Sequence, residues 1–254
     1  MQYQILPQLN EKVSKICLGT MTWGQQNSES DAHEQMDMAL SEGVNFWDTA
    51  EMYPSPPDKD KQGDTERFMG TWFNKTKQRD KVILASKISP MDFLRDGQTR
   101  YTAEHISSAI DGNLQRLQTD YIDIYQLHWP ERQANFFSQR GYTEEMAAQS
   151  LDNLTPFLET IQALNDEIRY LWEADKNGLI APITVQNPYS LLNRLYEVAM
   201  AEIAHRENVG LLAYSPLGFG VLSGKYLDGK RPAGARLTMY DRFARYTNEE
   251  ALSA

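Results

Sequence analysis

Four side chains with complementary acid–base chemistry stand at or just beyond the ends of apolar runs in the sequence. Asp48 ends the run 44–48, Lys87 ends the run 82–87 and His128 ends the run 122–128, while Tyr53 follows Asp48 by five residues. If these runs are parallel strands of one α/β barrel, the four side chains meet at the end of the barrel where such enzymes do their chemistry. A carboxylate, an ammonium and an imidazole around a phenol form a proton-donor site.

Each of these residues also has an ordinary structural explanation. A charged residue after an apolar run usually marks the point where a strand meets water. Asp48 and Lys87 alone would suit a simple buried salt bridge, and a lone histidine is usually a surface or hydrogen-bonded core residue. Four such residues at the same end of successive strands are harder to explain by chance, and their coincidence favours an enzyme.

The elements that would position these residues alternate along the chain between strand-like and helix-like segments. Such alternation predicts a parallel sheet wrapped by helices, that is, an α/β fold. We expect a hairpin over residues 3–13 and a helix capped by Ser30-Asp31 and another capped by Thr102. The long polar loop 129–150 is typical of a substrate-shaping loop at a barrel mouth. The expected strands are 16–19, 44–48, 82–87, 122–128, 183–186 and 209–214, and the expected helices are 30–41, 64–75, 102–117, 151–164, 168–176 and 195–206.

Five ordered motifs in this sequence resemble those of the aldo-keto reductases. They are the segments 18–24 (LGTMTWG), 48–53 (DTAEMY), 85–87 (ASK), 120–130 (DYIDIYQLHWP) and 214–218 (YSPLG). Segments 50–54 (AEMYP) and 185–193 (VQNPYSLLN) resemble most closely the bacterial Tas-like branch of that family. The resemblance implies a (β/α)8 TIM barrel, a single domain over residues 1–254, and NADPH-dependent reduction of an aldehyde or ketone to an alcohol.

The resemblance also implies a role for each of the four residues. Tyr53 is the expected proton donor, and its phenol has an ordinary pKa of roughly 10. The Lys87 ammonium would lower that pKa by stabilising the phenolate, and Asp48 would hold Lys87 in place. His128 would hydrogen-bond the carbonyl oxygen of the substrate. Trp23 and Trp129 would line the substrate pocket, as would Met52, Phe136, Phe137 and Tyr142, although core packing explains any one of these equally well.

Cofactor contacts are likewise expectations that come from the resemblance. Tyr214 would stack on the nicotinamide and Gln186 would bind its carboxamide, while the glycine-rich loop after Tyr214 would face the pyrophosphate of NADP(H). No Gly-x-Gly-x-x-Gly motif follows the first strand, which disfavours a Rossmann domain. Arg231 is a weaker candidate for the phosphate groups. The full set of expected cofactor residues is Gly19, Thr20, Met21, Asp48, Gln186, Tyr214, Ser215, Leu217, Gly218, Gly220, Lys225 and Arg236.

Only six of the eight barrel strands are found in this sequence. There is no room for a fifth strand between Leu164 and Arg169, where the family carries a Ser-Asn pair that holds the carboxamide. A final eighth strand is not found before Ala254. We therefore expect a missing segment near residues 165–169 and an absent C-terminal part. These gaps keep a second function open, namely a cofactor-binding regulatory or accessory protein of the same fold with slow or no turnover.

Composition limits the remaining possibilities. A net charge of −10 argues against nucleic-acid partners and anionic membrane surfaces. The single cysteine, Cys17, excludes an internal disulfide, and its apolar neighbours predict a buried strand residue. No metal-ligand cluster is visible, and His33, His105 and His205 are expected to face solvent on helices. Residues 1–12 do not form a signal peptide and no apolar run reaches membrane-spanning length, so we expect a soluble cytoplasmic protein.

Overall fold

The chain divides into two compact units, and each is described by itself. A computed structural model of the protein describes residues 1–6, 9–90, 100–132, 143–148, 154–171, 182–198, 200–249 and 251. The first unit comprises Met1–Gln4, Lys12–Phe136 and Arg140–Ile180, and the second comprises Ile5–Glu11, Phe137–Gln139 and Ala181–Ala254. The expectation of one domain over the whole chain stays a prediction.

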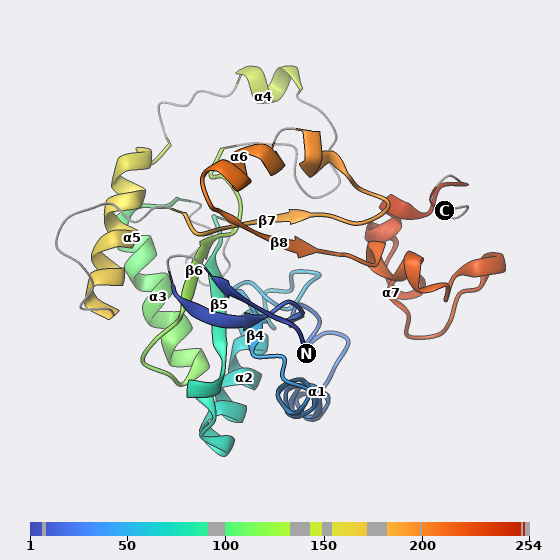
Figure 1. The fold of residues 1–254 in the computed structure, drawn as a ribbon, viewed down its shortest axis with the longest axis horizontal. Helices are drawn as coiled ribbons and strands as arrows, with labels where there is room; N and C mark the ends of the chain where they lie inside the picture. Colours follow the sequence, from blue (N-terminus) through green and yellow to red (C-terminus); the bar gives the residue numbers. More distant parts are fainter. Residues whose placement is uncertain are drawn as a thin grey trace. The chain divides into compact units, whose positions relative to one another are not determined.

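A four-stranded parallel sheet forms the centre of the first unit (Figure 1). Its strand order is β3-β4-β5-β6, and these strands are Cys17–Gly19, Phe46–Asp48, Ile83–Ile88 and Ile124–Leu127. In the register, Gly19 pairs with Asp48, Asp48 with Ala85, and Lys87 with Gln126. The four expected strands of this part of the chain are thus confirmed, and their carboxyl ends share one edge of the sheet.

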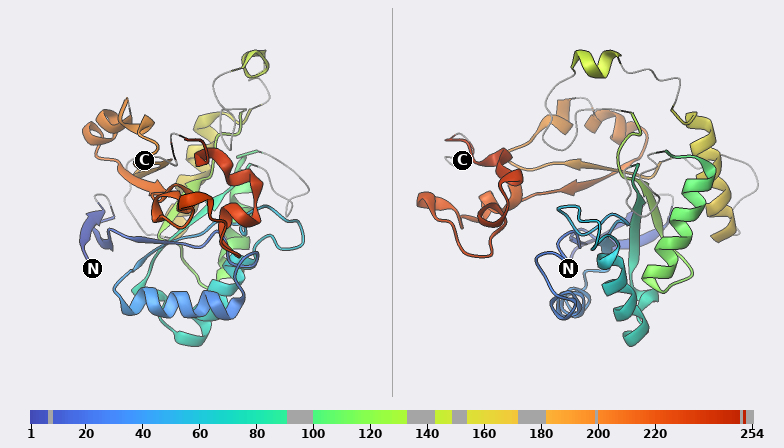
Figure 2. Two further views of the ribbon diagram at one scale, coloured as in Figure 1. Left: turned by 90° about the vertical axis from the view of Figure 1, so that its right-hand side faces the viewer. Right: turned by 180° about the vertical axis from the view of Figure 1, so that it is seen from behind.

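Helices cover one face of this sheet (Figures 1 and 2). They are α1 (Glu29–Ser41), α2 (Asp64–Thr76), α3 (Ala103–Leu117) and α5 (Phe157–Leu171). Alternate strand residues point to opposite faces, and Trp47 of β4 and Leu84 of β5 point to the helices. Both are fully buried with Met36, Met69 and Trp72 in one core cluster. The intervening residues of each strand therefore point to the other face.

Two helix starts show how local chemistry sets these elements. Thr102 caps α3 as expected, because its side chain accepts a hydrogen bond from the backbone N–H of His105. The expected cap at Ser30-Asp31 is wrong by two residues. Ser28 caps α1, because its hydroxyl oxygen accepts from the Asp31 N–H, and the Asp31 carboxylate accepts from the Ser28 N–H, so the two residues form a capping box.

The second unit contains a two-stranded parallel sheet of β7 (Thr184–Pro188) and β8 (Gly210–Tyr214). Both strands were expected. The predicted helix 195–206 is divided into η2 (Leu195–Val198) and α6 (Met200–Arg206). The described residues after β8 include the short helical segments η3 (Gly218–Ser223), η4 (Leu227–Gly229), α7 (Arg236–Met239) and η5 (Asp241–Tyr246).

The predicted N-terminal hairpin is present as a two-stranded sheet of β1 (Tyr3–Leu6) and β2 (Glu11–Ser14). The predicted break between the helices 151–164 and 168–176 is wrong, because residues 157–171 form the single helix α5. Residues 151–153 and 172–176 of these predictions lie outside the described residues. Two small elements, η1 (Arg79–Lys81) and α4 (Glu144–Ala148), complete the first unit. Among the residues that the structure describes between β6 and β7, none forms a strand, as the sequence predicts.

Candidate active site

The carboxyl ends of β4, β5 and β6 bring three of the four expected residues together. Asp48 is the last residue of β4, Lys87 lies at the end of β5, and His128 directly follows β6. Their side chains point to the face of the sheet opposite the helices. This follows from the alternation of side chains along a strand, because Trp47 and Leu84 point to the helices and lie an odd number of residues from Asp48 and Lys87. The backbone N–H of His128 still donates to Ile88 at 2.9 Å, so the sheet pairing continues to the site itself.

Lys87 and Asp48 form a buried ion pair. The Lys87 Nζ donates to Asp48 Oδ2 and to the carbonyl oxygen of Thr49, each at 2.6 Å, and the Lys87 side chain is only 1% exposed. Burial alone would lower the pKa of the Lys87 ammonium, but the negative charges of Asp48 and an ionised Tyr53 outweigh burial and raise this pKa above its usual value. The Lys87 ammonium is therefore favoured by its surroundings and is held in place by two acceptors.

Tyr53 lies beside that charge on the loop after β4. The Lys87 Nζ is 5.0 Å from the centroid of the Tyr53 ring, and the ring itself is buried. Backbone hydrogen bonds fix the loop on both sides of the tyrosine: Tyr53 N–H donates to Ala50 at 3.1 Å, and its carbonyl accepts from Gly63 N–H at 2.9 Å. The phenol is thus positioned by a folded loop and not by a strand.

His128 completes the group. Its ring lies edge-on to the Tyr53 ring at 5.7 Å between centroids, and 4.6 Å from the ring of Trp129. Desolvation and the nearby Lys87 cation lower the pKa of His128 well below 6.5, so the imidazole is neutral near pH 7. Its Nδ1 is buried and has no hydrogen-bond partner among the described residues.

The structure adds one residue that the sequence analysis missed. Gln126 on β6 donates through its Nε2 to Asp48 Oδ1 at 3.0 Å. The signal was present in the sequence, because Gln126 precedes His128 by two positions and residues two apart in a strand share a face. Gln126 was missed because its amide is neutral, has no acid–base chemistry and does not end an apolar run.

Other expected residues of the first unit lie near the phenol or support it. Thr20 donates through its hydroxyl to the Asp48 carbonyl oxygen at 2.9 Å, and the carbonyl of Met21 accepts from Ser55 N–H at 2.9 Å. Trp129, Met52 and Tyr53 share one buried cluster, against which Met21 packs. Gly19 is exposed at the end of β3.

Trp23 lies in a different environment from the one expected. It is fully buried in the same core cluster as Trp47 and Trp72, and its indole N–H donates to Gln35 at 2.9 Å. Its placement is that of a core residue, so its role in the substrate pocket remains a prediction. Three further pocket candidates, Phe136, Phe137 and Tyr142, lie outside the described residues.

The expected cofactor residues of the second unit lie on its two strands and in the segment that follows β8. Gln186 lies in β7 opposite Leu212, and Tyr214 is the last residue of β8 with its side chain 41% exposed. The segment that follows has left-handed backbone at four of its first six residues, Ser215, Gly218, Phe219 and Gly220. The remaining expected residues, Leu217, Lys225 and Arg236, lie in this segment or soon after it. Their assignment to a cofactor stays a prediction.

Two sequence predictions about single residues are wrong. Cys17 is exposed because it lies on β3, the edge strand of the sheet, so its apolar neighbours do not cover it. His105 is buried, and its Nδ1 hydrogen-bonds the carbonyl oxygen of Arg100 at 3.1 Å. His33 is partly buried against α2, where its Nε2 contacts the Phe68 carbonyl at 3.0 Å, and His205 is exposed as expected.

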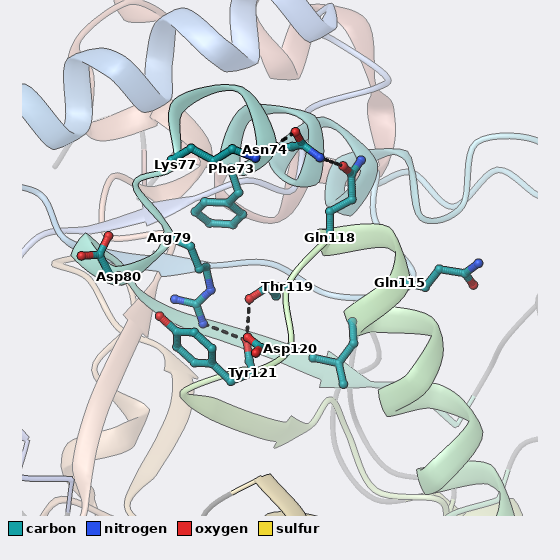
Figure 3. Close-up of a pocket in the computed structure, with 11 residues that line it drawn as sticks. Phe73, Asn74, Lys77, Arg79, Asp80, Gln115, Gln118, Thr119, Asp120 and Tyr121 are labelled. Carbon is teal, nitrogen blue, oxygen red and sulfur yellow. Dashed lines mark hydrogen bonds between the residues drawn. The ribbon is translucent and has the colours of Figure 1, made fainter.

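A hollow of about 700 Å³ lies at the opposite end of the first unit's sheet (Figure 3). Its polar side chains largely pair with one another or with nearby groups: Asn74 donates to Gln118 at 2.9 Å, and Arg79 forms an ion pair with Asp123 at 2.7 Å. In open and closed parallel sheets, ligands bind beyond the carboxyl ends of the strands. The group around Tyr53 is therefore the better candidate. The hollow is lined by Phe73, Asn74, Lys77, Arg79, Asp80, Leu114, Gln115, Gln118, Thr119, Asp120 and Tyr121.

Two other kinds of site were sought in the part of the chain that the structure describes. No group of three or more His, Cys, Asp or Glu side chains there is arranged to hold a metal ion. None of its helices combines the length and apolar character that crossing a bilayer requires.

Comparison with known proteins gives one consistent result. Residues 15–252 match the family model described as the aldo/keto reductase family. The chain is 46% identical over 273 residues to Protein tas of Escherichia coli (strain K12), an alignment that covers all of this chain and 79% of the relative. It is 33% identical over 260 residues to the uncharacterized oxidoreductase YrpG of Bacillus subtilis (strain 168), covering 93% of this chain and 72% of the relative.

A solved structure shows the same fold. The aldo-keto reductase AKR11C1 from Bacillus halodurans, in its holo form, superimposes with a TM-score of 0.65 at 24% identity, covering 92% of this chain and 71% of that one. This similarity confirms the (β/α)8 fold class. The alignment with the E. coli relative spans 273 positions, 19 more than the 254 residues of this chain. At least 19 residues of the relative thus have no counterpart here, while their location near residues 165–169 remains a prediction.

Proposed function

The chain belongs to the aldo/keto reductase family, and on that premise we propose that it reduces an aldehyde or a ketone to an alcohol with NADPH. The observation that carries the proposal is the position of the Lys87 ammonium, 5.0 Å from the centroid of the Tyr53 ring and buried with Asp48. A phenol beside a fixed cation is a proton donor suited to a carbonyl oxygen.

In this proposal each residue has one task. Tyr53 donates the proton to the substrate oxygen, and Lys87 stabilises the phenolate that remains. Asp48 balances and positions the ammonium. Because Nδ1 of the neutral His128 has no acceptor in reach, its proton is better placed on Nε2, which leaves Nε2 to donate a hydrogen bond to the carbonyl oxygen.

The residues of the second unit fit a dinucleotide. The exposed ring of Tyr214 offers a flat surface for stacking, and the loop after it approaches a ligand closely because Gly218 and Gly220 carry no side chains. The Lys225 ammonium lies close to the backbone of Gly220, since a Cβ on Gly220 would be 3.5 Å from the Lys225 Nζ. A phosphate bound to this backbone would be neutralised by that cation. When bound, the nicotinamide supplies the hydride. The chain's own residues supply the proton and the orientation.

The test is carbonyl reduction followed by the loss of nicotinamide absorbance with a simple aromatic aldehyde. Tyr53→Phe removes one hydroxyl and keeps the ring, and we expect kcat to fall by about 100-fold or more, the scale of general acid catalysis. Tyr121→Phe is the matched control. It makes the same chemical change at the hollow at the other end of the sheet and should keep kcat within about twofold, as expected of a surface site.

Full activity in Tyr53→Phe would refute the assigned proton donor. Tight binding of NADPH with little or no turnover in the unsubstituted protein would favour the regulatory alternative. Neither binding nor turnover would contradict both functions. Fluorescence titration of the reduced nicotinamide, run beside the rate assay, separates these outcomes.

A further inference from the structure

We propose that Gln126 is a positioning residue that orients the Asp48 carboxylate so that one oxygen faces Lys87. Its amide Nε2 donates to Asp48 Oδ1 at 3.0 Å, while Asp48 Oδ2 accepts from the Lys87 Nζ at 2.6 Å. This inference rests on the proposed reductase function and adds to it a residue that sets the position of the catalytic ammonium.

The sheet register explains why a glutamine is suited to this contact. Asp48 pairs with Ala85, and Ala85 pairs with Ile124, two residues before Gln126 on the same face. Neighbouring strands are about 4.8 Å apart, so β4 and β6 are separated by about 10 Å. On the strand between them, Lys87 pairs with Gln126 and its side chain lies on the same face. The long side chain of Gln126 reaches Asp48 from β6, with 3.0 Å between Nε2 and Oδ1.

The two Asp48 oxygens therefore have different kinds of partner. One binds a cation and the other binds a neutral amide, which fixes the plane of the carboxylate. A charged donor in place of Gln126 would compete with Lys87 for the same carboxylate. A neutral donor gives orientation without adding a charge, so the balance between Asp48 and Lys87 stays that of a single ion pair.

The position of that ion pair sets the charge felt by Tyr53. The groups that face Lys87 are Asp48 on β4, His128 after β6, Cys17 on β3 and the Tyr53 phenol itself. Of these, only Asp48 forms a direct ion pair with the ammonium among the described residues. If the carboxylate rotates, one of the two acceptors that hold the ammonium is displaced, and the stabilisation of the Tyr53 phenolate by Lys87 changes.

Two substitutions of similar size separate orientation from packing. Gln126→Met keeps the length and removes the amide donor. Gln126→Glu keeps the shape and replaces the donor by an acceptor with a negative charge beside Asp48. Gln115→Met, at an exposed position of α3, is the matched control for the loss of a glutamine.

The first readout is the ionisation of Tyr53 in the protein without cofactor. It is measured as phenolate absorbance against pH, as the difference between each protein and the same protein carrying Tyr53→Phe. We expect the Tyr53 midpoint to rise in both Gln126 variants and to rise most in Gln126→Glu, by about one pH unit. The second readout is kcat, which should fall about 10-fold in Gln126→Met with KM changed less than twofold, because one hydrogen bond to a charged group is lost.

An unchanged Tyr53 midpoint in both variants would overturn the inference, whatever the rate. A variant that unfolds more easily while its midpoint and kcat match those of Gln115→Met would show a purely structural role and overturn it as well. If the unsubstituted protein has no reductase activity, the proposed function fails, but the phenol titration still decides whether Gln126 acts on the Lys87–Tyr53 pair.

Discussion

At the scale of single residues, the electrostatics of this site are set by which of its buried side chains are charged. Lys87 is buried and charged because Asp48 compensates it, whereas His128 lies next to the same cation and is neutral. The two basic side chains thus take opposite states within one cluster. One consequence is a stability that depends on pH through His128.

The free energy of unfolding should fall as the pH is lowered from about 7 to about 5. In the unfolded chain His128 takes up a proton near its ordinary pKa of about 6.5, while the folded protein resists protonation because the pKa there is well below that value. The unfolded state therefore binds more protons at low pH. The contribution of His128 is complete above about pH 6.5 and is lost below it, at up to about 1.4 kcal/mol per pH unit.

Urea unfolding at several pH values tests this dependence. The comparison is between slopes, because His128→Asn also changes the absolute stability. His128→Asn should flatten the slope between pH 5 and 7, and His205→Asn, at an exposed position, should leave it as it is. Equal slopes in all three proteins would show that His128 does not contribute.

The same scale shows what the sequence could predict of the site. Asp48, Lys87 and His128 were found because each ends an apolar run and carries a group with obvious chemistry. Gln126 was missed because its function lies in a contact with a strand two positions away in the sheet. The exposure of Cys17 was also missed, since a run of apolar neighbours does not reveal which strand forms the edge of a sheet.

At the scale of elements, a buried polar network and a close approach of backbones hold α2 against α3 beneath the site. The Glu66 carboxylate is fully buried and accepts hydrogen bonds from Ser86 at 2.6 Å, from Asn113 at 2.6 Å and from Arg116 at 2.8 Å. Ser86 directly precedes Lys87, so this network fixes the strand that carries the Lys87 ammonium. At Gly70 the backbone of α2 comes close to the backbone at the end of α3.

Gly70→Ala should lower the free energy of unfolding by about 1–3 kcal/mol, the usual cost of overpacking a core. A Cβ at this position would lie 2.2 Å from the carbonyl oxygen of Arg116 and 2.9 Å from the carbonyl carbon of Leu117, which are backbone atoms at the end of α3. The helices would have to separate. Urea unfolding measures the effect.

Gly112→Ala is the control for this substitution. Gly112 is also a helical glycine, but the atoms nearest its Cβ would belong to the Arg116 side chain, with Nη1 at 2.9 Å. A side chain can adjust where backbone cannot, although Arg116 also donates through Nε to Glu66. The higher helix propensity of alanine should then leave the stability unchanged or raise it by up to about 1 kcal/mol. Equal losses at Gly70 and Gly112 would contradict the role assigned to the close approach.

Element positions were predicted better than element ends. All six expected parallel strands are present. Strands β4 and β5 are largely buried and correspond to continuous apolar runs, a pattern that distinguishes such strands from helices in a sequence. Helix ends depend on single hydrogen bonds, which is why Ser28 caps α1 although the sequence predicted a cap at Ser30-Asp31. Helix α5 continues through residues 165–169 because nothing in that segment, neither glycine nor proline, ends a helix.

At the scale of the whole molecule, the two units differ in how their sheets are supported. In the first unit, β4 and β5 each have a paired strand on both sides, and β4 is buried at every position. In the second unit, β7 and β8 pair with each other, and every residue of both strands is at least partly exposed. A parallel sheet is normally stabilised by burial on both faces and by more than two strands.

Backbone amides of β8 should therefore exchange with deuterium faster than those of β5, by about 10-fold or more, because local opening of a poorly buried pair of strands costs less free energy. Hydrogen exchange followed by mass spectrometry, on peptides that cover residues 83–88 and 210–214, measures this difference. Strand β6 is the control, because it is the edge strand next to β5. If β6 exchanges more slowly than β8, the fast exchange of β8 is not explained by its position at the edge of a sheet alone. Exchange of β8 as slow as that of β5 would mean that the second unit is held by interactions beyond those of its own two strands. The expected cofactor residues Gln186 and Tyr214 would then lie on a firm support before any cofactor binds, and not on a sheet that the cofactor must order.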